Sequence, residues 1–166
     1  RHRRRRVPRV CDLAAATGVP FRAPVVAPVA AVIDAVCPVT ISSRDDCAVF
    51  VSRVIRDVRS GVQSPFWLRE RLRRSGIRSI SPVVDVTNYV MLEMGQPLHA
   101  YDMDTLSGGL SVRRAVPGEK LQLLTGDEAA LDASVLVIAD ARGAVGMAGI
   151  MGGASTGVTE STQNVV

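Results

Sequence analysis

The first forty residues predict one short helix followed by an extended linker. Residues 7–17 place Val10, Leu13 and Ala14 on one side, and Gly18 follows them, as is typical of a helix that ends at a left-handed glycine. From Val19 to Thr40 four prolines recur among alanine and valine. Because proline and small residues at this density disfavour both helix and central strand, we expect an extended crossing between two domains.

The next elements are one strand and one helix. Residues 47–58 are rich in β-branched side chains with a loose alternation, which predicts a strand that opens the second domain. Ser64 and Pro65 then supply a capping hydroxyl and a proline at the first helical position, so a helix is expected over 66–74, ended by Gly76. Its apolar side chains should face the core: Trp67, Leu68 and Leu72.

A third helix is expected over 83–94, ended by Gly95, and it is apolar on nearly all sides. Such a helix should be buried. Burying polar groups without partners costs about 1 to 3 kcal/mol each, so the polar residues within it must cap, pair or line a cavity. These residues are Asp85, Thr87, Asn88 and Glu93.

From Gly108 onward short apolar runs alternate with turn residues. The pattern predicts strands over 110–115, 120–124, 134–139 and 144–148, with turns at Pro117-Gly118 and at 125–127. The expected fold class is therefore α+β, with a β-sandwich or barrel-like sheet that carries packed helices and is preceded by a short helical segment.

Composition narrows the class of protein. The chain has 166 residues, 47% of them apolar and 22% charged, as is normal for a globular protein with a core. No apolar run reaches the roughly 18 residues that span a bilayer, and no secretory signal follows the basic start, so a cytoplasmic location is the default expectation. The three cysteines form no CxxC pair and only two histidines are present, so no metal site is expected.

Charge by itself says little about the partner. The net charge is +4, but six arginines lie within the first nine positions, and the remaining chain has 14 basic against 16 acidic residues. That opening run fits either phosphate contact or a solvated terminus. Five further arginines between positions 69 and 78 leave the same two alternatives open, a tRNA backbone contact or a solvated helix face.

Three ordered blocks carry a family resemblance. They are SPFWLRERLRRSGIRSISPVVDVTNYVMLEMGQPLHAYD at 64–102, GEKLQLLTGDEAALDASVLVIAD at 118–140 and MAGIMGGASTGVTESTQNV at 147–165. Together they resemble the B3/B4 editing module of the bacterial phenylalanyl-tRNA synthetase beta subunit. Residues 9–24 resemble the end of the preceding B1 domain. The resemblance implies a B1-like remnant and linker over 1–40 and a B3/B4 domain over 41–166.

The resemblance also implies a function and partners. In that family the module hydrolyses tyrosine wrongly attached to tRNA(Phe), within an enzyme that joins phenylalanine to tRNA using ATP and Mg²⁺. A pocket for phenylalanine cannot fully reject a ligand with one added hydroxyl, whereas a second pocket can select for that hydroxyl. The implied partners are tRNA(Phe) and the alpha subunit; no cofactor is implied for this chain itself.

On the family's pattern, Thr87, Asn88 and His99 line the editing pocket, and Gly152 and Gly153 close around the aminoacyl group. His99 would orient or transfer a proton, with a packed core histidine as the alternative. For Thr87 and Asn88 the alternative to pocket lining is structural capping. Water is the expected nucleophile, and glycine-rich backbone offers N–H donors to an oxyanion.

Two expectations concern what the chain lacks. The family's pocket uses a glutamate that would fall just past Val166, so this chain is expected to be a fragment that is inactive by itself. The alternative function is a non-catalytic module of the same fold that binds tRNA or packs against other subunits. A freestanding editing protein is disfavoured by the B1-like segment.

Overall fold

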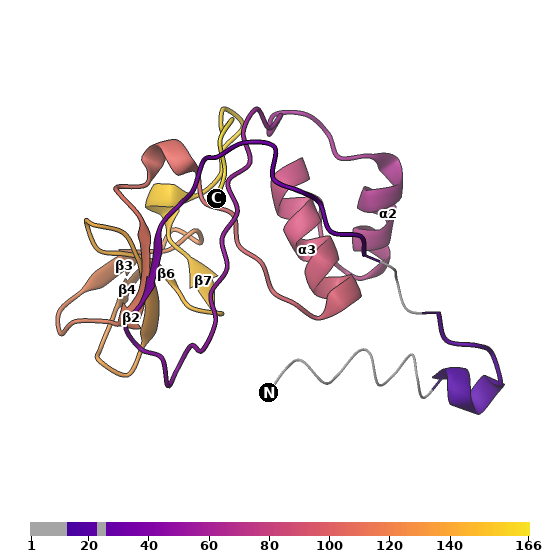
Figure 1. Cartoon of the computed structure of the whole chain (residues 1–166), viewed down its shortest axis with the longest axis horizontal. Helices are drawn as coiled ribbons and strands as arrows, with labels where there is room; N and C mark the ends of the chain where they lie inside the picture. The colour runs from indigo at the N-terminus through magenta and orange to yellow at the C-terminus, as the bar shows by residue number, and fades with distance from the viewer. Residues whose placement is uncertain (1–12, 23–25) are drawn as a thin grey trace.

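The structure of the chain is a computed structural model that describes residues 13–22 and 26–166 (Figure 1). Besides a helical stretch at residues 13–17, the helices are α2 (Phe66–Arg74) and α3 (Pro82–Met94), with short 3-10 turns η2 (Met103–Thr105) and η3 (Ala154–Thr156). Its strands are β1 (Val39–Ile41), β2 (Leu110–Arg114), β3 (Lys120–Gln122), β4 (Glu128–Ala130), β5 (Leu136–Ala139), β6 (Ala144–Met147) and β7 (Met151–Gly152). The α+β class expected from the sequence is confirmed.

The main sheet has the strand order β1-β2-β5-β6-β7. β1 pairs in parallel with β2, and every later pair is antiparallel. Because parallel neighbours need a long crossover, the chain between β1 and β2 has room for both helices. In Figure 1 the helix pair stands beside the sheet, with α2 on the far side of α3.

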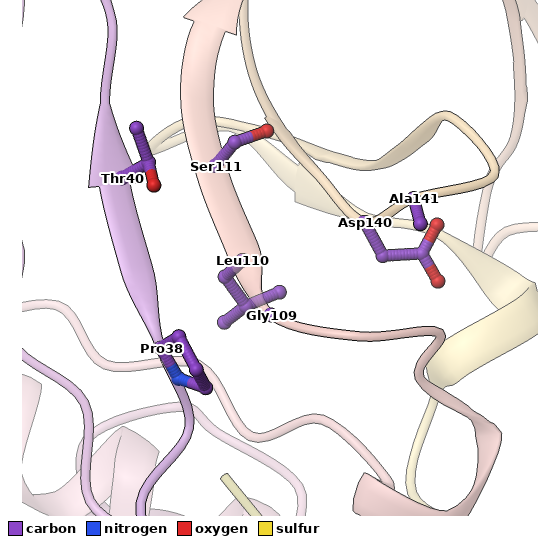
Figure 2. Close-up of a pocket in the computed structure, with 7 residues that line it drawn as sticks. All are labelled: Pro38, Thr40, Gly109, Leu110, Ser111, Asp140 and Ala141. Carbon is purple, nitrogen blue, oxygen red and sulfur yellow. The ribbon is translucent and has the colours of Figure 1, made fainter.

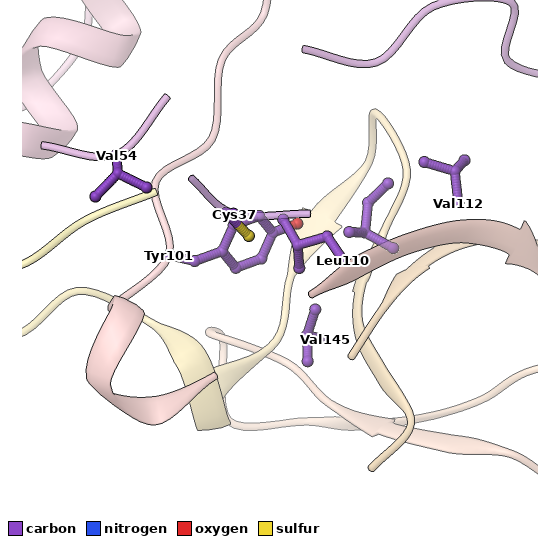
Figure 3. Packing of buried hydrophobic residues seen from close by; sticks show 7 residues of the cluster. Cys37, Val54, Tyr101, Leu110, Val112 and Val145 are labelled. Atoms are coloured by element: carbon purple, nitrogen blue, oxygen red, sulfur yellow. The ribbon is translucent and has the colours of Figure 1, made fainter. Parts of the chain in front are cut away.

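The sheet is buried on both faces. Leu110 and Val112 of β2 join Ile138 of β5 in one apolar cluster, part of which Figure 3 shows. Val137 and Ala139, the alternate residues of β5, belong to a second cluster on the opposite face. The hairpin β3–β4 contacts β6 and contributes Leu121 to this second cluster, so two layers enclose it. This arrangement is the sandwich-like part of the fold.

The first described residues agree in part with the expected first helix. Residues 13–17 are helical and Gly18 follows with a φ of 68°. The remainder of that prediction, residues 7–12, lies outside the described residues. Residues 26–38 form no regular element, and β1 begins at Val39, at the end of the expected linker.

The strand predicted over 47–58 is wrong. Val49 and Val51 are 74% and 83% exposed, and only Ile55 makes a ladder contact, a bridge to Val165. β-branched residues favour extended backbone, but a strand also needs a neighbouring chain along its length. Here the partner segment meets this stretch only near its end, through the Ile55–Val165 bridge and a hydrogen bond from Val58 N to Gln163 O at 2.9 Å, and not along Val49 and Val51.

Two details of the helices also differ from the sequence prediction. Ser64 does not cap α2, since its hydroxyl donates to Asp85 Oδ2 at 2.6 Å. Trp67 is 54% exposed and packs edge-on against Tyr89 of α3, whereas Leu68 and Leu72 are buried as expected. α3 ends at Gly95 as predicted but is only partly buried, because α2 covers just one of its sides.

Asp85 connects the two helices through three accepted hydrogen bonds. Its carboxylate accepts from the hydroxyls of Ser64 and Ser79 at 2.6 and 2.5 Å and from Ile80 N at 2.9 Å, and the residue is 0% exposed. It also lies in the first turn of α3, where negative charge is favoured by the helix dipole. The polar group that interrupts the apolar helix is therefore a structural one.

Replacing Asp85 with alanine is expected to lower the free energy of unfolding by about 3 kcal/mol, because two hydroxyls and an amide lose their acceptor. Asp85→Asn keeps one carbonyl oxygen and should cost less. Urea denaturation of both variants checks this. A loss below about 1 kcal/mol for the alanine variant would show that Asp85 does not hold the helices together.

Glu119 performs a similar role between strands. It accepts two hydrogen bonds from Arg113 at 2.8 and 2.7 Å, and others from Val116 N and Ala144 N at 3.0 and 2.9 Å. The hydrogen bonds from Arg113, opposed by burial and assisted by the two backbone amides, lower the pKa of Glu119 from 4.5 to about 2. One carboxylate thus connects three segments, namely strand β2, strand β6 and the turn that precedes β3.

This lowered pKa predicts a loss of stability in acid. Because the folded pKa lies below the unfolded one, the contribution is fully present above about pH 4.5 and disappears as the pH falls toward 2. The shift corresponds to roughly 3 kcal/mol at most. Unfolding free energies measured from pH 6 to pH 2 should fall more steeply for the natural chain than for Glu119→Gln; parallel curves would refute the assignment.

Candidate functional site

The glycine pair Gly152-Gly153 lies where β7 leaves the sheet. Gly152 pairs with Gly146 of β6, and Gly153 N donates to Val145 O at 2.8 Å. A Cβ atom on Gly153 would lie 2.7 Å from Val145 O and 2.8 Å from Leu121 Cδ1. Glycine is therefore required here because backbone and side chains approach too closely for any side chain.

His99 is brought directly against this turn. A Cβ atom on Gly152 would lie 2.4 Å from His99 Cε1 and 2.7 Å from His99 Nε2. The imidazole also packs edge-on against Tyr101, with ring centroids 4.6 Å apart. Although His99 as a residue is exposed, its ring thus rests on Gly152 and Tyr101. Two predicted site elements, distant in sequence, are neighbours in the structure.

Hydrogen bonds fix the segment that carries His99. Tyr101 exchanges backbone hydrogen bonds with Val166, both 3.0 Å long, and Asp102 N donates to Thr156 O at 2.9 Å. The Asp102 carboxylate, itself buried, accepts from Thr162 Oγ1 at 2.5 Å. The site therefore depends on the last described residues, which tie down the chain immediately after His99.

Tyr101 is a site residue that the sequence analysis missed. It is 4% exposed, and burial raises the pKa of its phenol well above the ordinary value. Its hydroxyl lies 3.5 Å from the position of a Cβ on Gly146, and Figure 3 shows the ring beside Cys37, Leu110 and Val145. An aromatic residue two positions after His99 was the available signal, since alternate residues of an extended segment share a face.

The structure places Thr87 and Asn88 on a different element. Thr87 Oγ1 donates to Val84 O of its own helix at 2.8 Å, and Asn88 is half-buried on the same helix. Among the described residues α3 makes its main contacts with α2. The structure joins His99 to Gly152, whereas no described contact joins Thr87 or Asn88 to that pair.

One surface hollow of the described residues lies away from His99 and Gly152. Figure 2 shows it at the start of β1 and β2, with a volume of about 300 Å³ and a lining of Pro38, Thr40, Gly109, Leu110, Ser111, Asp140 and Ala141. Asp140 is the only ionisable group there, and its oxygens already accept from Ser107 N, Arg142 N and the Arg142 guanidinium. Burial raises the pKa of Asp140, but the hydrogen bonds outweigh burial, and the pKa is lowered from its ordinary value. For a ligand, the hollow therefore provides backbone atoms and a carboxylate that is already hydrogen-bonded within the protein.

Residues 13–22 and 26–166 are the part of the chain that the structure describes. In that part of the chain no group of three or more His, Cys, Asp or Glu side chains is arranged to hold a metal ion. In the same residues no helix is long and apolar enough to cross a membrane.

The fold and the close glycine turn define a class of domain. A family model described as "B3/4 domain" matches residues 46–166, so the chain belongs to the B3/4 domain family. It is 48% identical over 155 residues to the phenylalanine--tRNA ligase beta subunit of Photorhabdus laumondii and 49% identical over 154 residues to that of Hahella chejuensis. Each match covers 93% of this chain and 20% of the relative, so the chain spans about a fifth of the relatives' length.

A solved structure is also similar. It is an N-terminal fragment of the phenylalanyl-tRNA synthetase beta subunit from Pyrococcus horikoshii, matched with a TM-score of 0.48 and 16% identity over 76% of this chain and 41% of that one.

His99 is expected to be uncharged near neutral pH. Desolvation by its neighbours lowers the pKa of His99 below 6.5. Titration of the histidine Cε1 protons by NMR, with the signal assigned through His99→Gln, should therefore give a midpoint below 6.5. A midpoint at or above that value would mean that the ring does not rest on Tyr101 and Gly152 in solution.

Proposed function

We propose that this chain is the editing module of a phenylalanine-tRNA ligase beta subunit, and that it hydrolyses Tyr-tRNA(Phe). The observation that carries the proposal is the His99 imidazole held against the Gly152-Gly153 turn. A neutral imidazole can accept a proton from water or orient it by hydrogen bonding. The glycine turn leaves room for this ring, because the imidazole occupies the place that a side chain on Gly152 would fill.

The geometry refines how the turn would contribute. Gly153 N–H already donates to Val145 O, so it is not a free donor for an oxyanion. In this proposal His99 therefore orients the water or accepts its proton, and the glycines contribute only the shape of the surface. Thr87 and Asn88, both half-buried on α3, are proposed to line the pocket as well.

The names of the relatives support a proposal for the parent enzyme and its partners. The parent enzyme joins phenylalanine to tRNA(Phe) with ATP and Mg²⁺, together with an alpha subunit, in the cytoplasm. Residues 41–166 form the editing domain and residues 1–40 a B1-like remnant with its linker. As a separate chain it is proposed to be inactive, and activity is expected only within a complete beta subunit.

A non-catalytic module of the same fold is the second candidate. It is favoured by one observation, the hydrogen bond from the Thr87 hydroxyl to Val84 O of its own helix, which uses the hydroxyl's one proton and leaves it no donor for a ligand.

The test replaces the matching segment of the Photorhabdus laumondii beta subunit with this chain and assembles the hybrid with its alpha subunit. The hybrid should release tyrosine from Tyr-tRNA(Phe), and His99→Ala should slow the release by about 100-fold, the size expected for a positioned proton-transfer group. Phenylalanylation serves as the folding control. A hybrid that charges phenylalanine but never hydrolyses Tyr-tRNA(Phe) would establish the non-catalytic alternative.

A further inference from the structure

Charge is strongly segregated in this chain. Residues 66–78 contain five arginines and one glutamate, a net charge of +4. The other residues from position 10 onward contain nine basic and fifteen acidic side chains, a net charge of −6. The α2 segment is therefore a local positive surface beside a chain that is acidic over the other residues from position 10 onward.

The same surface exposes two aromatic rings. Phe66 is 74% exposed and Trp67 54% exposed, both in the first turn of α2. Arg71 lies 6.0 Å from the centre of the Trp67 ring and donates to Tyr89 Oη at 2.9 Å, which holds the Trp67–Tyr89 pair in place. Arg73 and Arg74 extend beyond it with side chains 71% and 74% exposed.

We propose that this α2 surface, formed by Phe66, Trp67, Arg71, Arg73 and Arg74, binds unpaired RNA. Bases would stack on the exposed Phe66 and Trp67 rings, and the arginines would contact phosphates. Single-stranded nucleic acid combines negative charge with flat aromatic faces, and it is bound by arginines beside exposed rings. The acids on this surface are Glu70, which pairs with Arg73 and Arg74, and Glu93, 3.9 Å from Arg71, and they leave a net positive charge. An acidic protein partner would use the arginines but not the bare Phe66 ring. The surface is separate from His99, so this inference can succeed or fail independently of the proposed editing activity.

Trp67 makes the test local, because it is the single tryptophan of the chain. Titration of the full 166-residue chain with a 12-nucleotide single-stranded RNA should quench its fluorescence. A change at Trp67 distinguishes binding at α2 from binding at the arginine-rich first residues. Phe66→Ala should weaken the quenching-detected affinity by about 10-fold, within the range for one base stack.

Arginine variants test the charge. Arg73→Gln with Arg74→Gln should reduce the slope of log affinity against log salt by about 1.4, since each phosphate contact to a single strand contributes about 0.7. The matched control, Arg56→Gln with Arg59→Gln, removes the same charge from exposed positions elsewhere and should leave slope and quenching unchanged. Ile150→Ala, at a residue 72% exposed, is the control for Phe66.

Three results would overturn the proposal. One is RNA binding without Trp67 quenching, and another is an equal effect of the two arginine pairs. The third is equal quenching by polyglutamate or by duplex RNA of the same length, which would show that the surface selects charge and not unstacked bases.

Discussion

Gly153→Ala is expected to destabilise the fold by roughly 3 kcal/mol or more, a large part of the 5 to 15 kcal/mol typical of a domain. The added methyl group would lie 2.7 Å from Val145 O, and 2.8 Å from Leu121 Cδ1 of the second apolar cluster. A backbone oxygen inside a sheet cannot rotate away as a side chain can. Relief requires β6 and the segment after β7 to separate, which breaks the Gly153 N to Val145 O hydrogen bond.

Gly146→Ala is the matched control for this prediction. It adds the same methyl group on the neighbouring strand β6, where the nearest atoms are at 3.4 to 3.6 Å, ordinary contact distances. Its effect on the free energy of unfolding should stay within about 1 kcal/mol, because a Gly-to-Ala change also restricts the unfolded chain. Thermal and urea unfolding of both variants measure the difference; equal stabilities would contradict the close packing of Gly153.

The parts of the fold that sequence could predict are those set by local chemistry. Gly95 ends α3 and Gly118 and Gly126 occupy turns because each has a positive φ, which glycine adopts without steric cost. The four predicted strands after Gly108 survive with trimmed ends. The failures involve distant partners: β1, β4 and β7 contain only two or three residues each, too few to show a period.

The candidate site shows the same division. His99 and the glycines were found through resemblance, but their contact depends on how β7 and the segment before η2 meet, which no local pattern encodes. Tyr101 could not be predicted as a site residue, because an aromatic residue two positions from a histidine is equally typical of the hydrophobic core. Conversely, the buried polar group demanded by the apolar helix is Asp85, and its partners Ser64 and Ser79 lie in loops outside α3.

Gly152→Ala is expected to abolish most of the editing activity while leaving the fold largely intact. Its methyl group would lie 2.4 Å from His99 Cε1, the edge of a side chain that can swing away, and 3.2 Å from Leu124 Cδ1. The imidazole must then move by about 1 Å or more, a displacement that costs on the order of 100-fold in rate for a positioned group. Tyr-tRNA(Phe) hydrolysis by the hybrid beta subunit measures this loss, and thermal unfolding should show a smaller change than for Gly153→Ala.

A double-mutant cycle separates displacement of His99 from general damage. If the methyl group acts through the imidazole, adding Gly152→Ala to His99→Ala should cost almost nothing further, because the atom it strikes is gone. The two effects would then be strongly non-additive. Additive losses, each near their separate values, would mean that the added methyl blocks the aminoacyl ester itself, and the glycine would be a wall of the pocket instead of a seat for the histidine. Both readings keep Gly152 in the site, but only non-additivity makes its role the placement of His99.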